Sequence, residues 1–234
     1  MKAIFLLIIM FILVESARAQ ITNESEAGLA SANGNTKTQT FNFKQSNTYT
    51  WRDNVLAFKG RYLNAKAGGV ETARYLDSGL RYERKLTAHR NIFVGETYQQ
   101  DKFANYQNRY ITDIGGKQFF MQSEETKFFG ELGYRYMKEE RFIGRSVTSN
   151  YGRAYTEWEN KWNENFSTKY WVEYLPNFTE PNDWQANTEL SLSVVMTKIL
   201  SLKSGVLVRY DHLPAPGIAY KEDTLVTTAF VAKF

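Results

Sequence analysis

The sequence predicts an all-β fold, a transmembrane antiparallel β-barrel of about 12 strands formed by residues 20–234. Three observations predict it. The chain opens with a short apolar segment, its last segment alternates apolar and polar residues, and the connections between its extended segments alternate in length. Together these features are typical of barrels of the outer-membrane type, with short periplasmic turns and longer extracellular loops.

The N-terminal residues have the features of a secretory signal peptide. Met1 and Lys2 give a positive start, residues 3–14 are an unbroken apolar run, and Ala17-Arg18-Ala19 is a small-x-small cleavage pattern. A spanning helix needs about 20 apolar residues, so the run is too short for one, although a retained anchor helix is the alternative. We therefore expect residues 1–19 to be removed and the barrel to comprise residues 20–234.

Composition narrows the function classes. The absence of cysteine excludes disulfides and cysteine-ligated metals. The 29 basic and 25 acidic residues give a net charge of +4 without a clustered basic face, so nucleic acid is not an expected partner. Aromatic residues make up 15% of the chain, which suits interfacial girdles but also a soluble sugar-binding β-sandwich, the alternative fold.

Turn residues divide the chain into twelve extended segments, most of them near the roughly ten residues that a tilted membrane strand needs. The expected strands are 24–32, 36–50, 54–64, 72–85, 91–100, 108–120, 126–138, 151–162, 166–175, 183–197, 200–211 and 224–234. The second is polar on both faces over residues 36–39, and the fifth fits either register. The three expected strands before the C-terminal one alternate clearly, with charges on one face and apolar residues on the other.

The seventh segment illustrates this alternation, because Glu131 and Arg135 fall on the face opposite Leu132 and Tyr134. A lipid-facing Lys or Arg costs about 2–4 kcal/mol at mid-bilayer, so a barrel wall is expected to keep its charges on the inner face.

The C-terminal segment ends on an aromatic residue, with apolar residues at alternate positions before it. Val226, Phe230 and Phe234 share one face, and Lys233 lies on the other. An exposed strand of this kind would promote aggregation in a soluble protein, whereas a barrel pairs it with the first strand. It resembles the terminal strand of bacterial outer-membrane proteins, which implies that these three residues are an assembly signal read by the barrel-assembly machinery.

The connections alternate between short and long. The short ones are residues 51–53, 86–90, 121–125, 163–165 and 198–199, and the long ones are 65–71, 101–107, 139–150, 176–182 and 212–223. The first connection, residues 33–35, is short although its position predicts a loop on the long side. With both termini in the periplasm, the short turns would lie there and the long loops outside.

The charged faces of the strands give the candidate lumen-lining residues. They are Lys59, Arg61, Asp77, Arg81, Asp113, Lys117, Glu131, Arg135, Arg153, Glu157, Lys169, Glu173, Glu189 and Arg209, and we also expect Glu83, Glu96 and Lys203 to point inward. Bases and acids nearly cancel, and twelve strands lie between filled and wide barrels, so a narrow pore and a salt-bridged plug are both compatible with the sequence. A purely structural role of these charges is equally compatible.

Bulky residues share the inner face. Phe119, Phe129, Tyr155 and Trp171 would either pack the interior or form a stacking track for a solute. Packing is the simpler interpretation, because no second motif singles them out.

The sequence gives little reason to expect an enzyme. His89 and His212 lie outside any nucleophile motif, and charge pairing explains Glu157 and Glu159 as well as acid–base catalysis does. Metal-ligand spacings and phosphate-binding glycine loops are absent. We predict no catalytic, cofactor-binding or metal-binding residue.

Three stretches resemble a known family. They are residues 27–36, with a Gly-Asn-Thr turn; residues 98–109, with Asp101-Lys-Phe103 where Asp-Arg-Phe is common; and Phe129-Gly-Glu-Leu-Gly-Tyr134. The family is that of the salt-induced outer-membrane proteins of the YdiY type from Gram-negative bacteria. The resemblance implies architecture and location in the bacterial outer membrane, and it supplies neither a substrate nor an active-site residue.

These observations favour a monomeric outer-membrane barrel with a passive channel or structural envelope role, whose partners are outer-membrane lipid and the assembly machinery. A surface-recognition barrel that binds through the loops 139–150 and 212–223 is the second hypothesis. A lipid-modifying barrel enzyme is the third.

Overall fold

The computed structural model describes residues 19–32 and 37–234. The expected signal peptide, apart from Ala19, and the predicted turn at residues 33–35 lie outside the described residues. Within the described part of the chain, no helix is long and apolar enough to cross a membrane.

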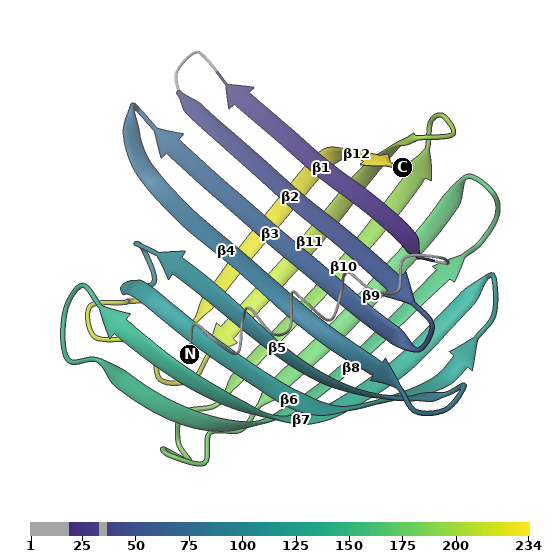
Figure 1. Ribbon diagram of the computed structural model, residues 1–234. Helices are drawn as coiled ribbons and strands as arrows, with labels where there is room; N and C mark the ends of the chain where they lie inside the picture. The colour runs from purple at the N-terminus through teal and green to yellow at the C-terminus, as the bar shows by residue number, and fades with distance from the viewer. Residues whose placement is uncertain (1–18, 33–36) are drawn as a thin grey trace.

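The chain forms a closed antiparallel β-barrel, which confirms the predicted fold class (Figure 1). Each strand pairs with its neighbours in sequence, and β1 pairs with β12 to close the barrel. The strands are β1 Gln20–Ala32, β2 Thr38–Trp51, β3 Asn54–Ala67, β4 Val70–Lys85, β5 Arg90–Asp101, β6 Tyr106–Gln122, β7 Thr126–Arg141, β8 Val147–Lys161, β9 Phe166–Leu175, β10 Gln185–Val195, β11 Leu200–Asp211 and β12 Glu222–Lys233.

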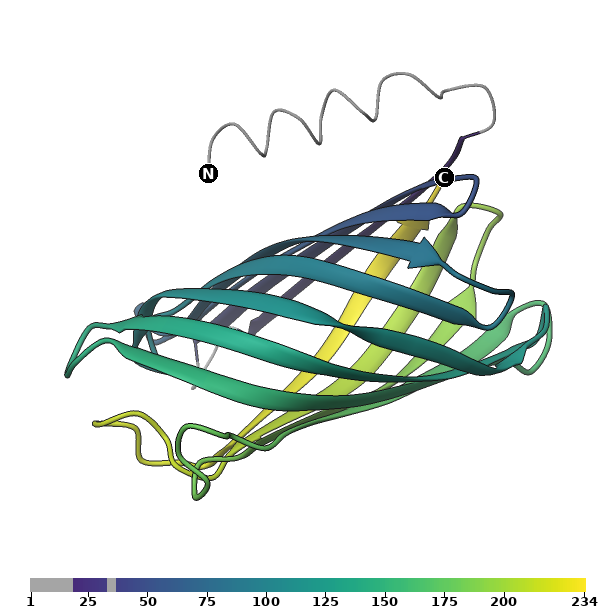
Figure 2. The same ribbon diagram turned by 60° about the horizontal axis from the view of Figure 1, so that its bottom comes forward.

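The connections define two rims at opposite ends of the barrel (Figure 2). The turn rim carries residues 52–53, 86–89, 123–125, 162–165 and 196–199, together with the C-terminus. The loop rim carries residues 102–105, 142–146, 176–184 and 212–221 and the turn at Gly68 and Gly69. The long connections are therefore all on one rim.

Several strands run further toward the loop rim than the sequence predicts. The prediction of a seven-residue loop at 65–71 is wrong, because β3 and β4 continue to a tight turn at Gly68 and Gly69. Their φ angles of 59° and 83° lie in the left-handed region that glycine adopts without strain. The loop expected at 139–150 shrinks to residues 142–146, because Glu139 and Arg141 form ion pairs inside the barrel and extend β7.

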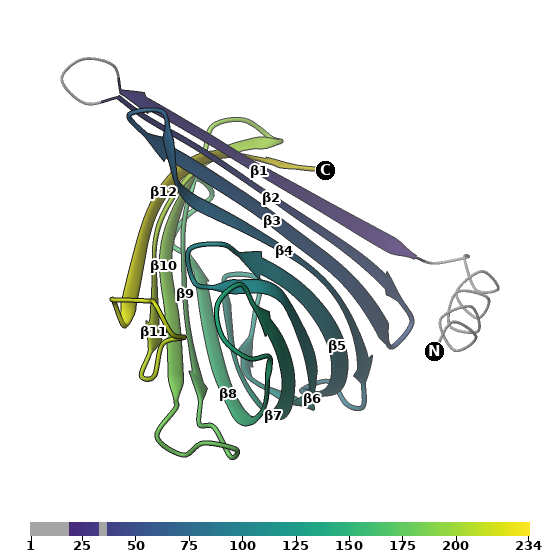
Figure 3. The same ribbon diagram turned by 90° about the vertical axis from the view of Figure 1, so that its left-hand side faces the viewer.

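The seam between β1 and β12 closes the barrel near the turn rim. Glu24 to Ala27 pair with Phe230 to Lys233, and the backbones of Asn23 and Phe234 exchange hydrogen bonds of 2.9 and 3.0 Å. Beyond this zone the two strands diverge toward the loop rim (Figures 1 and 3). At the start of the divergence, a Cβ on Gly28 would lie 2.6 Å from the carbonyl oxygen of Thr228, so a glycine is required for the close approach.

The outer face of the barrel is apolar. Leu132, Val226 and Ile114 are 74%, 68% and 57% exposed. Aromatic pairs lie toward the strand ends, with Trp51 beside Tyr82 near the turn rim. An apolar face of this extent is stabilised by lipid rather than water.

Glu96 corrects one expectation about this face. The charge pattern predicted that it points inward, but it borders a shallow outer depression with Phe58, Leu80 and Tyr110, and the Thr112 hydroxyl donates to its carboxylate at 2.7 Å. The cause is the register of β5, which the sequence left open. Phe93 turns into the barrel beneath charged side chains, and the pleat then directs Glu96 outward.

Candidate functional site

One side of the barrel interior is filled by a compact set of charged residues, which we call the charged plug. It comprises four bases and four acids from β4 and β6–β9: Arg81, Glu83, Asp113, Lys117, Glu131, Arg135, Arg153 and Glu173. Their formal charges cancel. The plug is therefore a neutral network rather than a charged patch.

Glu131 is the centre of the plug and is only 4% exposed. The Arg81 guanidinium donates to both of its oxygens at 2.7 and 3.1 Å, the bidentate arrangement that arginine favours. Arg153 donates at 2.7 Å, and the Lys117 ammonium lies 3.3 Å away. A single carboxylate thus neutralises part of the charge of three cations from three strands.

Glu173 joins the plug to β9. It accepts from Arg153 at 2.6 Å, from Arg135 at 3.0 Å and from the Asn187 amide at 3.0 Å. Arg135 in turn donates to both oxygens of Asp113 at 2.7 and 2.9 Å. Full pairing of this kind is what makes buried charge tolerable inside a protein.

The aromatic ring of Phe93 packs against the plug. The Arg81 guanidinium lies 3.7 Å from the ring centre of Phe93, which is buried. The ring fits because Gly115 on β6 faces Gly133 on β7, and a Cβ on Gly115 would lie 2.8 Å from Phe93 Cζ. The glycines of β6 and β7 therefore leave space for the Phe93 ring, which packs against the plug.

A row of aromatic rings runs beside the plug across β6–β9. Ring centres are 5.5 Å apart for Phe119 and Phe129, 6.0 Å for Phe129 and Tyr155, and 5.8 Å for Tyr155 and Trp171. Only Trp171 of these four borders open space inside the barrel. The other three rings pack against one another.

The other side of the interior is open. A cavity of about 1230 Å³ extends along the inner faces of β1–β3 and β9–β12 and, toward the loop rim, also borders β4–β8. Its lining includes Glu124, Asn163 and Lys198 from the turn rim and Asp183 and Tyr220 from the loop rim. The cavity therefore reaches both ends of the barrel beside the charged plug.

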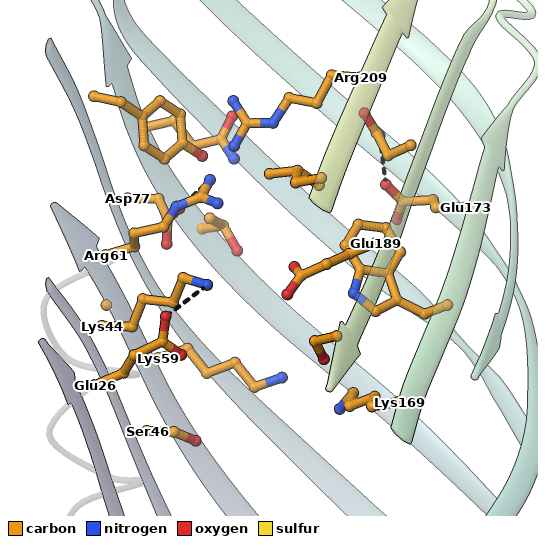
Figure 4. A pocket seen from close by; sticks show the side chains of 18 of the residues that line it. Glu26, Lys44, Ser46, Lys59, Arg61, Asp77, Lys169, Glu173, Glu189 and Arg209 are labelled. Atoms are coloured by element: carbon orange, nitrogen blue, oxygen red, sulfur yellow. Dashed lines mark hydrogen bonds and ion pairs between the residues drawn. The ribbon is translucent and has the colours of Figure 1, made fainter. Parts of the chain in front are cut away.

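Most cations on the cavity wall have a carboxylate partner. Lys44 and Lys203 lie 3.1 and 3.0 Å from the two oxygens of Glu26, and Arg61 lies 3.2 Å from Asp77. Figure 4 shows Glu26, Lys44, Arg61 and Asp77 on the wall formed by the N-terminal strands. They leave this part of the wall close to neutral.

Arg209 crosses toward the opposite wall. It and Arg61 lie over the ring of the buried Tyr75, with guanidinium carbons 4.5 and 4.3 Å from the ring centre. Tyr75 belongs to a small apolar cluster with Leu63 and Tyr106. The contact between β11 and β4 therefore narrows the cavity on its way to the loop rim (Figure 4).

Lys169 and Lys59 lie nearer the turn rim. The Lys169 ammonium pairs with Glu157 at 2.8 Å, and Glu157 also accepts a hydrogen bond from the Tyr155 hydroxyl. In the described part of the chain, Lys59 has no carboxylate within 4.0 Å, and its ammonium extends into the cavity (Figure 4). Lys59 is thus a lumenal cation without an ion pair.

The loops at the loop rim are held together by Asn105. Its amide donates to the carbonyl oxygens of Ile143 and Pro216 at 2.9 and 3.0 Å, and its side-chain oxygen accepts from the Ile143 amide at 2.9 Å. One buried side chain therefore connects three loops above the cavity.

Asp183 lies in another connection of the loop rim, residues 176–184. It accepts from Asn177 at 2.9 Å and from Tyr151 at 3.3 Å, while its other oxygen is buried without a hydrogen-bond partner. Burial raises the pKa of its carboxyl above the ordinary value of 3.8, and the two hydrogen bonds oppose this shift.

Most residues expected in the lumen border the cavity or belong to the charged plug, and Arg135 and Glu173 do both. Those that border the cavity are Lys59, Arg61, Asp77, Arg135, Lys169, Glu173, Glu189 and Arg209. The others, Arg81, Asp113, Lys117, Glu131 and Arg153, lie in the charged plug, and Glu157 lies beside Lys169. Sequence reasoning missed Glu26, Lys44, Arg109 and Glu139; the one available signal was that Lys44 is the single charge within β2.

The remaining named residues lie at the barrel ends or outside. Val226, Phe230 and Phe234 are exposed on the outer face. His89 is in a turn of the turn rim, whereas His212 lies at the loop rim and stacks on Trp184 with ring centres 5.2 Å apart. The two histidines are therefore at opposite ends.

Comparisons with known proteins give a family and a fold. The sequence profile of the family described as "Protein of unknown function, DUF481" matches residues 25–234. This match confirms the resemblance seen in the sequence. No curated protein matches the chain.

Two solved porin structures resemble the barrel. The NanC porin shares 10% identity, with a TM-score of 0.57 over 90% of this chain and 98% of that one. The KdgM porin in complex with disordered oligogalacturonate shares 11% identity, with a TM-score of 0.50 over 91% of this chain and 99% of that one. At these identities the likeness concerns the fold alone.

Proposed function

The chain belongs to the DUF481 family, whose function is unknown, and we propose that it is an outer-membrane β-barrel that acts as a narrow passive channel. The cavity carries this proposal, because its lining includes residues of both rims. A water-filled space that reaches both ends of a membrane barrel is a path for small polar solutes.

The charged plug sets the width of that path. A barrel of about 16–18 strands leaves a wide aqueous channel, whereas about eight strands are filled by side chains. Here the plug, with side chains from β4 and β6–β9, fills part of the interior, and the open space passes it along β1–β3 and β9–β12. We therefore propose a narrow channel rather than a general porin.

The location and partners form part of the same proposal. The apolar outer face suits outer-membrane lipid, and residues 1–19 suit export through the inner membrane. Val226, Phe230 and Phe234 would be recognised by the barrel-assembly machinery, and the assembled protein would be a monomer with no nucleic-acid partner. The two porin-like folds support this assignment.

Conductance across a planar lipid bilayer tests the proposal. The folded barrel, identified by its heat-modifiable mobility on gels, should produce discrete current steps that are small beside those of wide porins. Heat-denatured protein in the same detergent is the control. Absence of steps from verified folded protein would contradict the channel and favour a structural envelope role.

A further inference from the structure

We infer that Lys59 and Lys169 form an anion-binding subsite inside the channel, which takes the carboxylate of a small sugar acid. This inference rests on the proposed channel function and names the solute class that the channel favours. It depends on charge, geometry and the polar and aromatic groups around the two ammonium groups.

One cation at this level of the cavity, Lys59, has no carboxylate within 4.0 Å among the described residues. Lys59 extends from β3 and Lys169 from β9 on the opposite wall (Figure 4). The cations nearby are each paired with a carboxylate: Lys169 with Glu157, Arg81 with Glu131, and Lys117 with Glu83. Because Glu157 already pairs with Lys169 at 2.8 Å, the positive charge of Lys59 is left for a mobile anion.

The contrast with Lys44 and Lys203 is informative. Those two lysines share Glu26 at 3.1 and 3.0 Å, and Lys203 also lies 3.9 Å from Glu189. At their level the fixed charges balance. The position of the subsite is therefore determined by which lysine lacks an ion pair, and not by the total charge of the cavity wall.

The surroundings suit a sugar ring. Trp171 lies two residues after Lys169 on the same face of β9 and borders the cavity, where its ring stacks on Tyr155. Ser46 is the direct neighbour of Lys59 across the β2–β3 pair. An aromatic face, a hydroxyl and a cation that converge on one space can together recognise the apolar face, the hydroxyls and the carboxylate of a sugar acid.

Carboxylates at the turn rim do not cancel this effect. Glu124, Glu125 and Glu164 lie in the turns there, exposed at the mouth of the cavity. Salt screens exposed charges over about 8–10 Å at physiological ionic strength. The narrower interior around Lys59 is screened less.

Ion selectivity gives the first test. In a KCl gradient across a planar bilayer, the reversal potential of the wild-type channel should show chloride preference over potassium. Lys59→Gln should lower the permeability ratio about fourfold, the effect of one charge acting through water at roughly 5 Å. Lys138→Gln removes a lysine from the outer face, where it pairs with Glu140, and should leave the ratio unchanged.

Block by a sugar acid gives the second test. Glucuronate should reduce the chloride current of the wild type and of Lys138→Gln, whereas glucose, the neutral counterpart, should not. Lys59→Gln should abolish the block. Lys169→Gln is an independent variant of the opposite wall, and it should weaken the block even if Lys59→Gln yields too little folded barrel.

Failure of the subsite differs from failure of the channel. Absence of conductance in the wild type would contradict the proposed channel function itself. Conducting variants with wild-type selectivity and glucuronate block equal to the wild type would leave the channel intact and overturn the subsite.

Discussion

The two sides of the barrel interior have similar residues but opposite arrangements. In the charged plug, four acids and four bases of β4 and β6–β9 pair across several strands and fill the space. On the side of β1–β3 and β9–β12, charged residues pair along the wall, Lys59 pairs with no carboxylate among the described residues, and a cavity of about 1230 Å³ remains. The difference shows that pairing geometry, and not composition, decides whether a charged lumen is closed or open.

The length of the arginine side chains on the plug side explains part of this difference. Arg81 and Arg153 reach a common carboxylate from strands that are not neighbours, with Glu131 between them. On the open side, most partners lie on neighbouring strands, as Arg61 and Asp77 do, so their side chains stay against the wall. The plug therefore connects strands across the barrel through ion pairs, whereas on the open side Arg209 crosses to β4 through its contact with the Tyr75 ring.

The largest effect is expected from the centre of the plug. Glu131→Gln removes the carboxylate shared by Arg81, Lys117 and Arg153, so that the four cations of the plug are left with three acids and one positive charge is no longer compensated. Breaking a buried pair in this way costs about 3–5 kcal/mol, so the free energy of unfolding measured with urea in lipid vesicles should fall by that order.

Glu189→Gln is the matched control on the open side. Glu189 lies 3.9 Å from Lys203 as its nearest cation, and its loss should cost less than about 1 kcal/mol. Equal losses for the two variants would contradict the distinction between the plug and the cavity wall.

Packing beneath the plug should give an intermediate effect. An added methyl group in Gly115→Ala would lie 2.8 Å from both Phe93 Cζ and the Gly133 Cα, so the strands or the ring must shift. Overpacking of this kind costs about 1–3 kcal/mol, which the same urea titration would detect.

Gly60→Ala makes the same substitution in β3, where the added methyl group would lie on the outer face beside Phe58. Its nearest atom would be 3.6 Å away, an ordinary contact, and we expect no loss of stability. A Gly115→Ala barrel as stable as the Gly60→Ala barrel would contradict the close packing next to the plug.

The smallest effect concerns the loops above the cavity. Because the pKa of Asp183 is raised, the folded state binds the carboxyl proton more tightly than the unfolded state does. The stabilisation of the folded state by this proton is complete below the unfolded pKa. It is lost as pH rises through the folded pKa. Asp183→Asn should therefore be more stable than the wild type at neutral pH, by less than about 1 kcal/mol because the group is only half-buried, and equal to it in acid.

Thermal unfolding across this pH range measures the difference. Glu180→Gln changes an exposed carboxylate of the same loop and should follow the wild type at each pH. A stability advantage of Asp183→Asn that grows toward acid would contradict a raised pKa for Asp183.

The sequence predicted the barrel well because its wall obeys a simple rule. Charged and apolar residues alternate wherever one face meets lipid, as Glu131 and Leu132 do. The strands and their number could therefore be predicted from a single sequence. The fifth strand shows the limit of the rule. Glu96 faces outward and Phe93 inward, because a buried phenylalanine beneath arginines and a hydrogen-bonded outer glutamate break the alternation.

The division of the interior could not be predicted from the sequence. Arg81 and Glu131 are 50 residues apart, and no local pattern indicates that they meet. The strand ends could not be predicted well either. A charged residue such as Glu139 is typical of a loop, and only its ion-pair partners inside the barrel show that it belongs to a strand. Contacts across the lumen depend on barrel closure, which brings together strands that are remote in sequence.

Access of a thiol reagent to the cavity tests the central distinction most directly. The chain has no cysteine, so a single one can be introduced on either side of the interior. In bilayers, Ser46→Cys on the cavity wall should react with a membrane-impermeant thiol reagent added from either compartment, and the conductance should fall. Asn91→Cys, behind Glu83 of the plug, should not react. A Ser46→Cys barrel that is folded but cannot be reached, or that is reached from one side alone, would contradict a path from rim to rim.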